Sequence, residues 1–138
     1  MKKQINKVEE FHKIYKLGIS DTPVAVLSNN NHKLRYELMK EENEEYLEAT
    51  LNNDIVEVAD ALGDMLYVLC GTMIEHGMQN LMEEVFEEIH RSNMSKLDEN
   101  GNPIYREDGK VIKGPNFSKP DIEKILKRGS IISEGVKK

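Results

Sequence analysis

The sequence predicts an all-α protein: a four-helix bundle followed by a long loop with a β-hairpin and by a short terminal helix. The first observation is composition. Of 138 residues, 38% are hydrophobic, 32% are charged and none is Trp, which is typical of helical bundles with charged outer faces. The second is that apolar residues recur at helical spacing in four segments. The third is length, which suits one average domain, so we expect a single domain over residues 1–138.

The first two helices are joined by a polar connection. Residues 5–17 carry apolar side chains at helical spacing, and Gly18 is expected to stop this helix. Residues 18–31 contain Asp, Pro, Ser and three consecutive Asn residues, as connections commonly do. A long helix is then predicted over residues 32–51, which ends at the Asn52-Asn53 pair.

The third and fourth helices complete the bundle. Asp54 can cap the third helix, residues 55–76, because its carboxylate can accept hydrogen bonds from the first free backbone N–H groups. Gly77 follows as the stop, since glycine readily takes the left-handed conformation found at helix ends. The fourth helix is predicted over residues 80–96, so the bundle core occupies about residues 5–97.

A long irregular segment, about residues 98–118, follows the bundle. It is rich in Gly, Asn, Pro and Asp, and a loop this long in a compact domain is expected to be functional or disordered. Apolar residues flank Asp108-Gly109, a pair that favours a β-hairpin turn. A short helix is predicted over residues 120–128, capped by Ser118 or Asp121, with a frayed tail after it.

Charge and cysteine content exclude several classes of function. The net charge of −6 repels phosphate backbones, so nucleic-acid binding is not expected. Cys70 is the single cysteine and lies in an apolar run, which suits a reducing cytoplasm. The longest apolar stretch, residues 61–74, is shorter than the roughly 20 residues that span a membrane. The charged N-terminal segment lacks a signal-peptide pattern, so we expect a cytoplasmic protein without a membrane anchor.

Two glutamates of the helix at residues 32–51 fall inside its apolar sector. This sector is defined by Leu34, Leu38, Met39, Tyr46 and Ala49. Glu42 and Glu45 project into its middle, with Glu41 at its border. The remaining glutamates lie on the opposite, solvated face: Glu37, Glu44 and Glu48. A buried carboxylate without a partner costs on the order of several kcal/mol, so Glu42 and Glu45 need a partner.

The next helix repeats this pattern. Glu57, Asp60 and Asp64 form a line that turns apolar one helical turn later, so it is not expected to face only water. The two helices thus aim about five carboxylates at a shared interior, with too few cations to neutralise them. Carboxylate oxygens are the ligands that Mg²⁺ prefers, at about 2.0–2.1 Å. A cluster without sulfur and poor in histidine indicates Mg²⁺ or Mn²⁺ rather than zinc.

The spacing of these acids resembles a known family. Glu41-Glu42-Asn43-Glu44-Glu45, then Glu57-Val-Ala-Asp60 and an apolar run containing Asp64, is similar to the E-E-x-x-E and E-x-x-D pattern of MazG-like all-α nucleoside triphosphate pyrophosphohydrolases. Their superfamily includes phosphoribosyl-ATP pyrophosphohydrolase and the dimeric dUTPases. The resemblance covers roughly residues 34–96 and, more loosely, residues 113–120. It implies Mg²⁺ between the helices, a homodimer or dimer of dimers, and cleavage of a nucleoside triphosphate between the α and β phosphates.

The resemblance also implies roles for individual residues. Metal ligands would come from Glu42, Glu45, Glu57, Asp60 and Asp64. Many members have Glu where this chain has Ala61, so the acidic pair is either Glu57 with Asp60 or Asp60 with Asp64. Glu41 would orient or deprotonate the attacking water. The substrate phosphates would be bound by Asn93 and Lys96, and by Lys113 from a lid-like loop.

Two other classes of protein compete with this interpretation. Di-iron helical bundles use two E-x-x-H pairs, and the chain contains Glu9-Glu-Phe-His12 and Glu87-Glu-Ile-His90. The second pair lies among other acids on a face predicted to be solvated. The second alternative is a non-catalytic acidic helical interaction domain, whose carboxylates would be surface groups without metal affinity.

Overall fold

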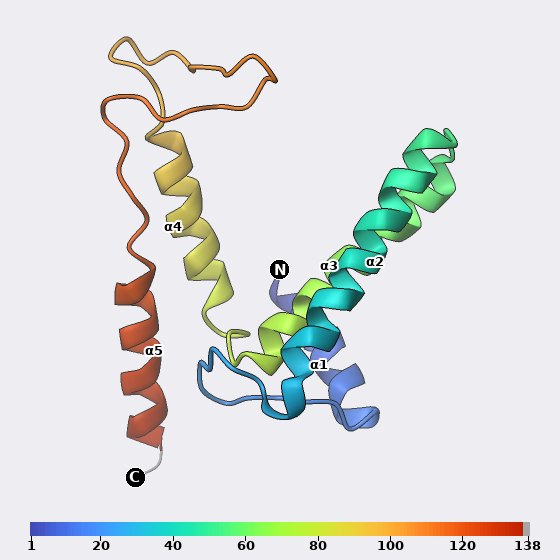
Figure 1. The fold of residues 1–138 in the computed structure, drawn as a ribbon. Helices are drawn as coiled ribbons and strands as arrows, with labels where there is room; N and C mark the ends of the chain where they lie inside the picture. The colour runs from blue at the N-terminus through green and yellow to red at the C-terminus, as the bar shows by residue number, and fades with distance from the viewer. Residues whose placement is uncertain (137–138) are drawn as a thin grey trace. The chain divides into compact units, whose positions relative to one another are not determined.

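A computed structural model describes residues 1–136 of the chain, and side chains up to residue 130 (Figure 1). The fold is all-α, as predicted, and none of its described helices is long and apolar enough to cross a membrane. The chain divides into two compact units, residues 1–80 and a second unit that begins at Leu81. The elements are α1 (Lys2–Ile14), the 3-10 helix η1 (Ser28–Asn30), α2 (Asn31–Leu51), α3 (Ile55–Glu75), α4 (Met82–Met94) and α5 (Ile122–Val136).

The first unit is a bundle of α1, α2 and α3. α2 and α3 lie side by side in opposite directions along most of their length. α1 packs against the C-terminal half of α3 (Figure 1). Ile5 and Val8 of α1 are buried, as are Cys70 and Ile74 of α3. Burial of this apolar surface is the main favourable contribution to the stability of the unit.

Capping residues set the ends of α2 and α3 where the sequence places them. Asn53 takes a left-handed backbone conformation (φ 54°) and ends α2, while Oδ1 of Asp54 accepts hydrogen bonds from the N–H groups of Val56 (3.1 Å) and Glu57 (3.2 Å). Gly77 follows α3 with a φ of 70°. The predicted caps are therefore confirmed. The prediction for the first helix was wrong at its end, because α1 stops at Ile14 before a left-handed Lys16 instead of reaching Leu17.

The second unit consists of α4, a long loop and α5. The predicted hairpin is reduced to one antiparallel bridge, between Tyr105 and Val111, around the turn at Asp108-Gly109. The terminal helix begins after Asp121, whose Oδ1 accepts from the Lys124 N–H at 3.2 Å. It extends to Val136, so its predicted end near Arg128 was too early. The prediction of a single domain stays a prediction.

Candidate active site

Glu42 on α2 lies in the least favourable environment of the predicted metal ligands. Its side chain is half-buried, and Oε2 is shielded from water with no hydrogen-bond partner among the described residues. Burial raises the pKa of this carboxyl above its ordinary value of 4.5, and the nearby Glu45, Asp64 and Glu41 raise it further. The negative charges of acids on both α2 and α3 therefore act on Glu42, and among the described residues none of the groups that shift its pKa is a cation.

The other predicted ligands are more open to solvent. Glu45 is exposed, so the expectation that it points into the protein interior was wrong within a single chain. Glu45 and Glu57 line a hollow of about 350 Å³ at the turn between α2 and α3. Asp60 is exposed on α3. Within the part of the chain that the structure describes, no three acidic, histidine or cysteine side chains converge closely enough to hold a metal ion as they stand.

The two registers for the acidic pair of α3 differ in how they relate to α2. Asp64 is the α3 acid whose charge raises the pKa of Glu42. Glu57 lies about two turns earlier on α3 and shares the hollow with Glu45. The acids of α3 thus follow those of α2 in the reverse order, as expected for two antiparallel helices.

Sequence reasoning missed a buried polar cluster in the same unit. Arg35 of α2 and Glu75 of α3 are 6% and 4% exposed, and an Arg35 Nη1 atom lies 3.4 Å from Oε1 of Glu75. Asn31 donates to the other oxygen of Glu75, and His12 of α1 is hydrogen-bonded through Nδ1 to the Gly18 carbonyl at 2.9 Å. Arg35 precedes Glu42 by seven residues and shares its face of α2, which is the signal that could have identified it.

The predicted phosphate-binding residues, Asn93, Lys96 and Lys113, all lie in the second unit. Backbone hydrogen bonds connect the segments that carry them. The Asn93 carbonyl accepts from the Lys96 N–H at 3.2 Å, and the Lys96 carbonyl accepts from the Gly114 N–H at 2.9 Å. These bonds bring Lys113 beside the end of α4, where its Nζ lies 4.5 Å above the Phe117 ring. The backbone of residues 113–114 therefore lies beside the segment that follows α4, and the role of these residues in phosphate binding stays a prediction.

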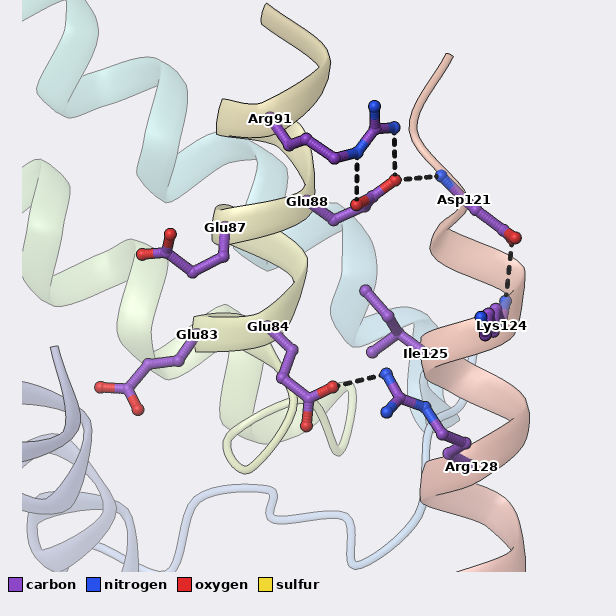
Figure 2. A pocket seen from close by; sticks show the side chains of 9 residues that line it. All are labelled: Glu83, Glu84, Glu87, Glu88, Arg91, Asp121, Lys124, Ile125 and Arg128. Carbon is purple, nitrogen blue, oxygen red and sulfur yellow. Dashed lines mark hydrogen bonds and ion pairs between the residues drawn. The ribbon is translucent and has the colours of Figure 1, made fainter. Parts of the chain in front are cut away.

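An ion pair connects α4 to α5 beside a hollow of about 610 Å³, and a second ion pair lies within α4 (Figure 2). Arg91 and the Asp121 N–H both donate to Glu88, which lowers the pKa of its carboxyl to about 2. Glu84 binds Arg128 at 2.7 Å, whereas Glu87 points away from α5 (Figure 2). The acids on this side of α4 are thus matched by cations, in contrast to those around Glu42.

The residues of the di-iron alternative have other partners or surroundings. Glu9 forms an ion pair with Lys13 at 2.7 Å, and the Nδ1 atom of His12 is hydrogen-bonded to the Gly18 carbonyl. Glu87 and His90 are exposed on α4. These positions do not favour a di-iron site.

A family model described as phosphoribosyl-ATP pyrophosphohydrolase matches residues 8–93, which include every candidate acid and most of the chain. The chain belongs to this family. The resemblance inferred from the spacing of the acids is therefore confirmed. The family match supports a nucleotide pyrophosphohydrolase. Its acids on α2 and α3, together with Asn93, lie inside the matched region, whereas Lys96 and Lys113 lie beyond it.

The family member is also similar to a solved structure from Exiguobacterium sp. 255-15, which is named provisionally as an NTP pyrophosphohydrolase. The two chains share 23% sequence identity over 98% of each, with a TM-score of 0.48. No curated protein sequence matches the chain. The family match alone therefore carries the assignment.

Proposed function

We propose that the chain is a Mg²⁺-dependent nucleoside triphosphate pyrophosphohydrolase that also accepts Mn²⁺. It would cleave the bond between the α and β phosphates and release a nucleoside monophosphate and pyrophosphate. The observation that supports this most directly is Glu42, whose Oε2 is shielded from water without a hydrogen-bond partner among the described residues and whose pKa is raised by Glu45 and Asp64. A protein retains such a group at a cost in stability, and function is the usual reason.

The donor atoms of these side chains, all carboxylate oxygens, are of the kind that a hard divalent cation prefers. Glu42, Glu45 and Asp64 would supply the carboxylate oxygens, with Glu57 and Asp60 near them on α3. The free oxygen of Glu42 offers an unused ligand atom. When bound, such a cation lowers the pKa of a coordinated water and offsets the charge of the phosphates.

The remaining residues would act on the water and on the substrate. Glu41 is exposed beside Glu42, so it could accept the proton of an attacking water. Lys96 and Lys113 would bind the negatively charged phosphates of the substrate. No side chain of the protein is required as the nucleophile.

The products of hydrolysis test this proposal. The purified chain, incubated with Mg²⁺ and a panel of ribo- and deoxynucleoside triphosphates, should yield monophosphate and pyrophosphate, resolved by ion-exchange chromatography. The double variant Glu42→Gln with Glu45→Gln should lose this activity. The matched control, Glu37→Gln with Glu44→Gln, changes two exposed acids of the same helix and should keep it. Release of diphosphate and phosphate, or equal activity in both double variants, would contradict the proposal.

We further propose that the chain acts as a homodimer or a dimer of dimers. Large apolar side chains are exposed along α2 and α3 of the single chain, among them Leu62, Leu66 and Leu69. Met39, Met65, Leu66 and Leu69 line an apolar hollow of about 300 Å³ between the two helices. Contiguous apolar surface of this kind marks interaction sites, and the resemblance names a second copy as the occupant.

Light scattering coupled to size exclusion tests the assembly. The 15.9 kDa chain should elute with the mass of two or four copies. Leu66→Glu should shift it towards a monomer, because a charge in a buried interface is costly. Glu44→Leu, on the opposite side of α2, serves as a control and should leave the mass unchanged. A wild-type monomer at micromolar concentration would refute this part of the proposal.

A further inference from the structure

We propose that Arg35 is a positioning residue, whose guanidinium fixes the register of α2 against α3 and so holds Glu42 beside Asp64. The role rests on the proposed function, because it concerns the acids that would bind the cation. Arg35 itself touches none of these acids. It acts through the distance that it imposes between two helices.

The contacts of Arg35 join α2 to three consecutive turns of α3. Nη2 donates to the Val68 carbonyl at 2.9 Å, and Nε donates to Oγ1 of Thr72 at 3.1 Å. Nη1 lies 3.4 Å from Oε1 of Glu75. Because the guanidinium is planar and rigid, it satisfies these three acceptors together in only one placement of α2 along α3.

This placement bears directly on the acids. Arg35 and Glu42 are seven residues apart on one face of α2, which is about 10.5 Å along the axis. On α3, the Val68 carbonyl that accepts from Arg35 lies one turn from Asp64. A slip of one helix along the other would therefore break the contacts of Arg35 and separate Glu42 from Asp64 at the same time.

The surroundings of Arg35 are built to hold the guanidinium in place. Gly71 leaves room for it, since a Cβ atom at this position would lie 2.6 Å from Nη2 of Arg35. Asn31 donates to Glu75, and the hydroxyl of Thr72 donates to the Val68 carbonyl at 2.8 Å. Desolvation lowers the pKa of Arg35 and the charge of Glu75 opposes this, so the buried cation keeps a compensating anion.

The need for such a device follows from repulsion at the acids. Glu42 on α2 and Asp64 on α3 carry like charges, and their repulsion favours separation of the two helices. Arg35 opposes separation from two turns away, where its charge does not occupy the ligand oxygens. Arg35 thus limits how far the two helices that carry the acids can separate before a cation binds, which contributes to preorganisation of a site.

The first experiment measures Mn²⁺ affinity by electron paramagnetic resonance of the free ion. Arg35→Met with Glu75→Gln removes both buried charges together, so that neither is left without a partner. We expect Mn²⁺ affinity to fall roughly 10- to 100-fold, the range found when partners that orient metal ligands are removed. Ile5→Ala, a core change on α1, is the control for lost stability and should leave the affinity of the folded protein unchanged. Unchanged affinity in the double variant would overturn the proposal.

A second measurement needs no metal. Spin labels at the exposed positions Asn43 and Gly63 report the separation of α2 and α3 by pulsed resonance, with labelled chains diluted in unlabelled protein. Cys70 is buried and does not take a label. Arg35→Met with Glu75→Gln should broaden or lengthen the distance distribution, and Ile5→Ala should not. An unaltered distribution overturns the positioning role.

Two further outcomes separate this inference from the proposed function. Wild-type protein that binds no Mn²⁺ would refute the metal site, while the label distances would still decide the role of Arg35. Arg35→Lys keeps the charge but presents a single donor centre, so it should restore neither affinity nor distance. If Arg35→Lys has the Mn²⁺ affinity and label distances of wild type, positive charge alone suffices. That result would overturn the claim that the several donors of the guanidinium set the register of the helices.

Discussion

Two glycines of α3 provide a matched test of the packing around Arg35. Gly63 and Gly71 both lie in the interior of this helix, so replacement by Ala makes the same chemical change at both. A Cβ atom at Gly63 meets nothing within 4 Å. At Gly71 it would lie 2.6 Å from Nη2 of Arg35 and 2.8 Å from Nε2 of His12. The two variants should therefore change stability in opposite directions.

The magnitudes follow from these distances. Ala in place of an unhindered helical Gly stabilises by about 0.5–1 kcal/mol, which is the expectation for Gly63→Ala. At Gly71 the same gain is opposed by overpacking of about 1–3 kcal/mol. Displacing the Arg35 guanidinium also weakens hydrogen bonds worth about 1.5–3 kcal/mol each. We expect Gly71→Ala to be less stable than wild type by about 1–4 kcal/mol.

Urea denaturation followed by circular dichroism measures this difference. The three proteins are compared at one concentration, because stability depends on concentration in an oligomer. Gly71→Ala should also weaken Mn²⁺ binding, since it displaces the residue that positions the acids, whereas Gly63→Ala should not. A Gly71→Ala protein as stable as Gly63→Ala would refute the close packing of Arg35 against α3.

Two other predictions concern the cap of α3 and the acid at its centre. Asp54→Ala removes the acceptor of two backbone N–H groups and should destabilise the protein by about 0.5–2 kcal/mol in thermal denaturation, whereas Asp54→Ser should retain most of the stability. Glu42→Gln should change the pH dependence of stability in EDTA. The folded state raises the pKa of Glu42 above 4.5, so its favourable contribution is complete below that value and is lost as pH rises through the raised pKa. The variant should gain stability over wild type as pH increases from 4 to 8, and a constant difference would contradict the assignment.

The helices could be predicted because their limits depend on local chemistry. Asp54, Asn53 and Gly77 act on backbone groups within a few residues, so sequence alone identifies them as caps. The first helix was harder, because Gly18 suggested a stop that the left-handed Lys16 provides earlier. The hairpin was predicted from its turn residues, and one antiparallel bridge forms around that turn. Its turn residues are favourable, but a two-stranded ribbon needs a surface to pack on before it extends beyond one bridge.

The acids of the site could be predicted only in part. Helical phase places Glu42 on the apolar face of α2, and in the structure its side chain is half-buried and its pKa is raised in part by the charge of Asp64. The same phase suggested burial for Glu45, which is exposed, because a helical wheel gives direction but not the extent of the neighbouring element.

Arg35 shows that the helix face on which a residue lies predicts the residues of the α2–α3 interface better than their hydrophobicity does. A search for misplaced acids finds Glu42 and stops there, since a long cation is usually expected to reach solvent. Yet a site of like charges between two helices requires an attraction elsewhere along the same interface. Arg35, one heptad before Glu42 and opposite a glycine of α3, supplies it through Val68, Thr72 and Glu75. A buried Arg on the face that carries unpaired acids is therefore the pattern to seek when two helices hold a cation between them.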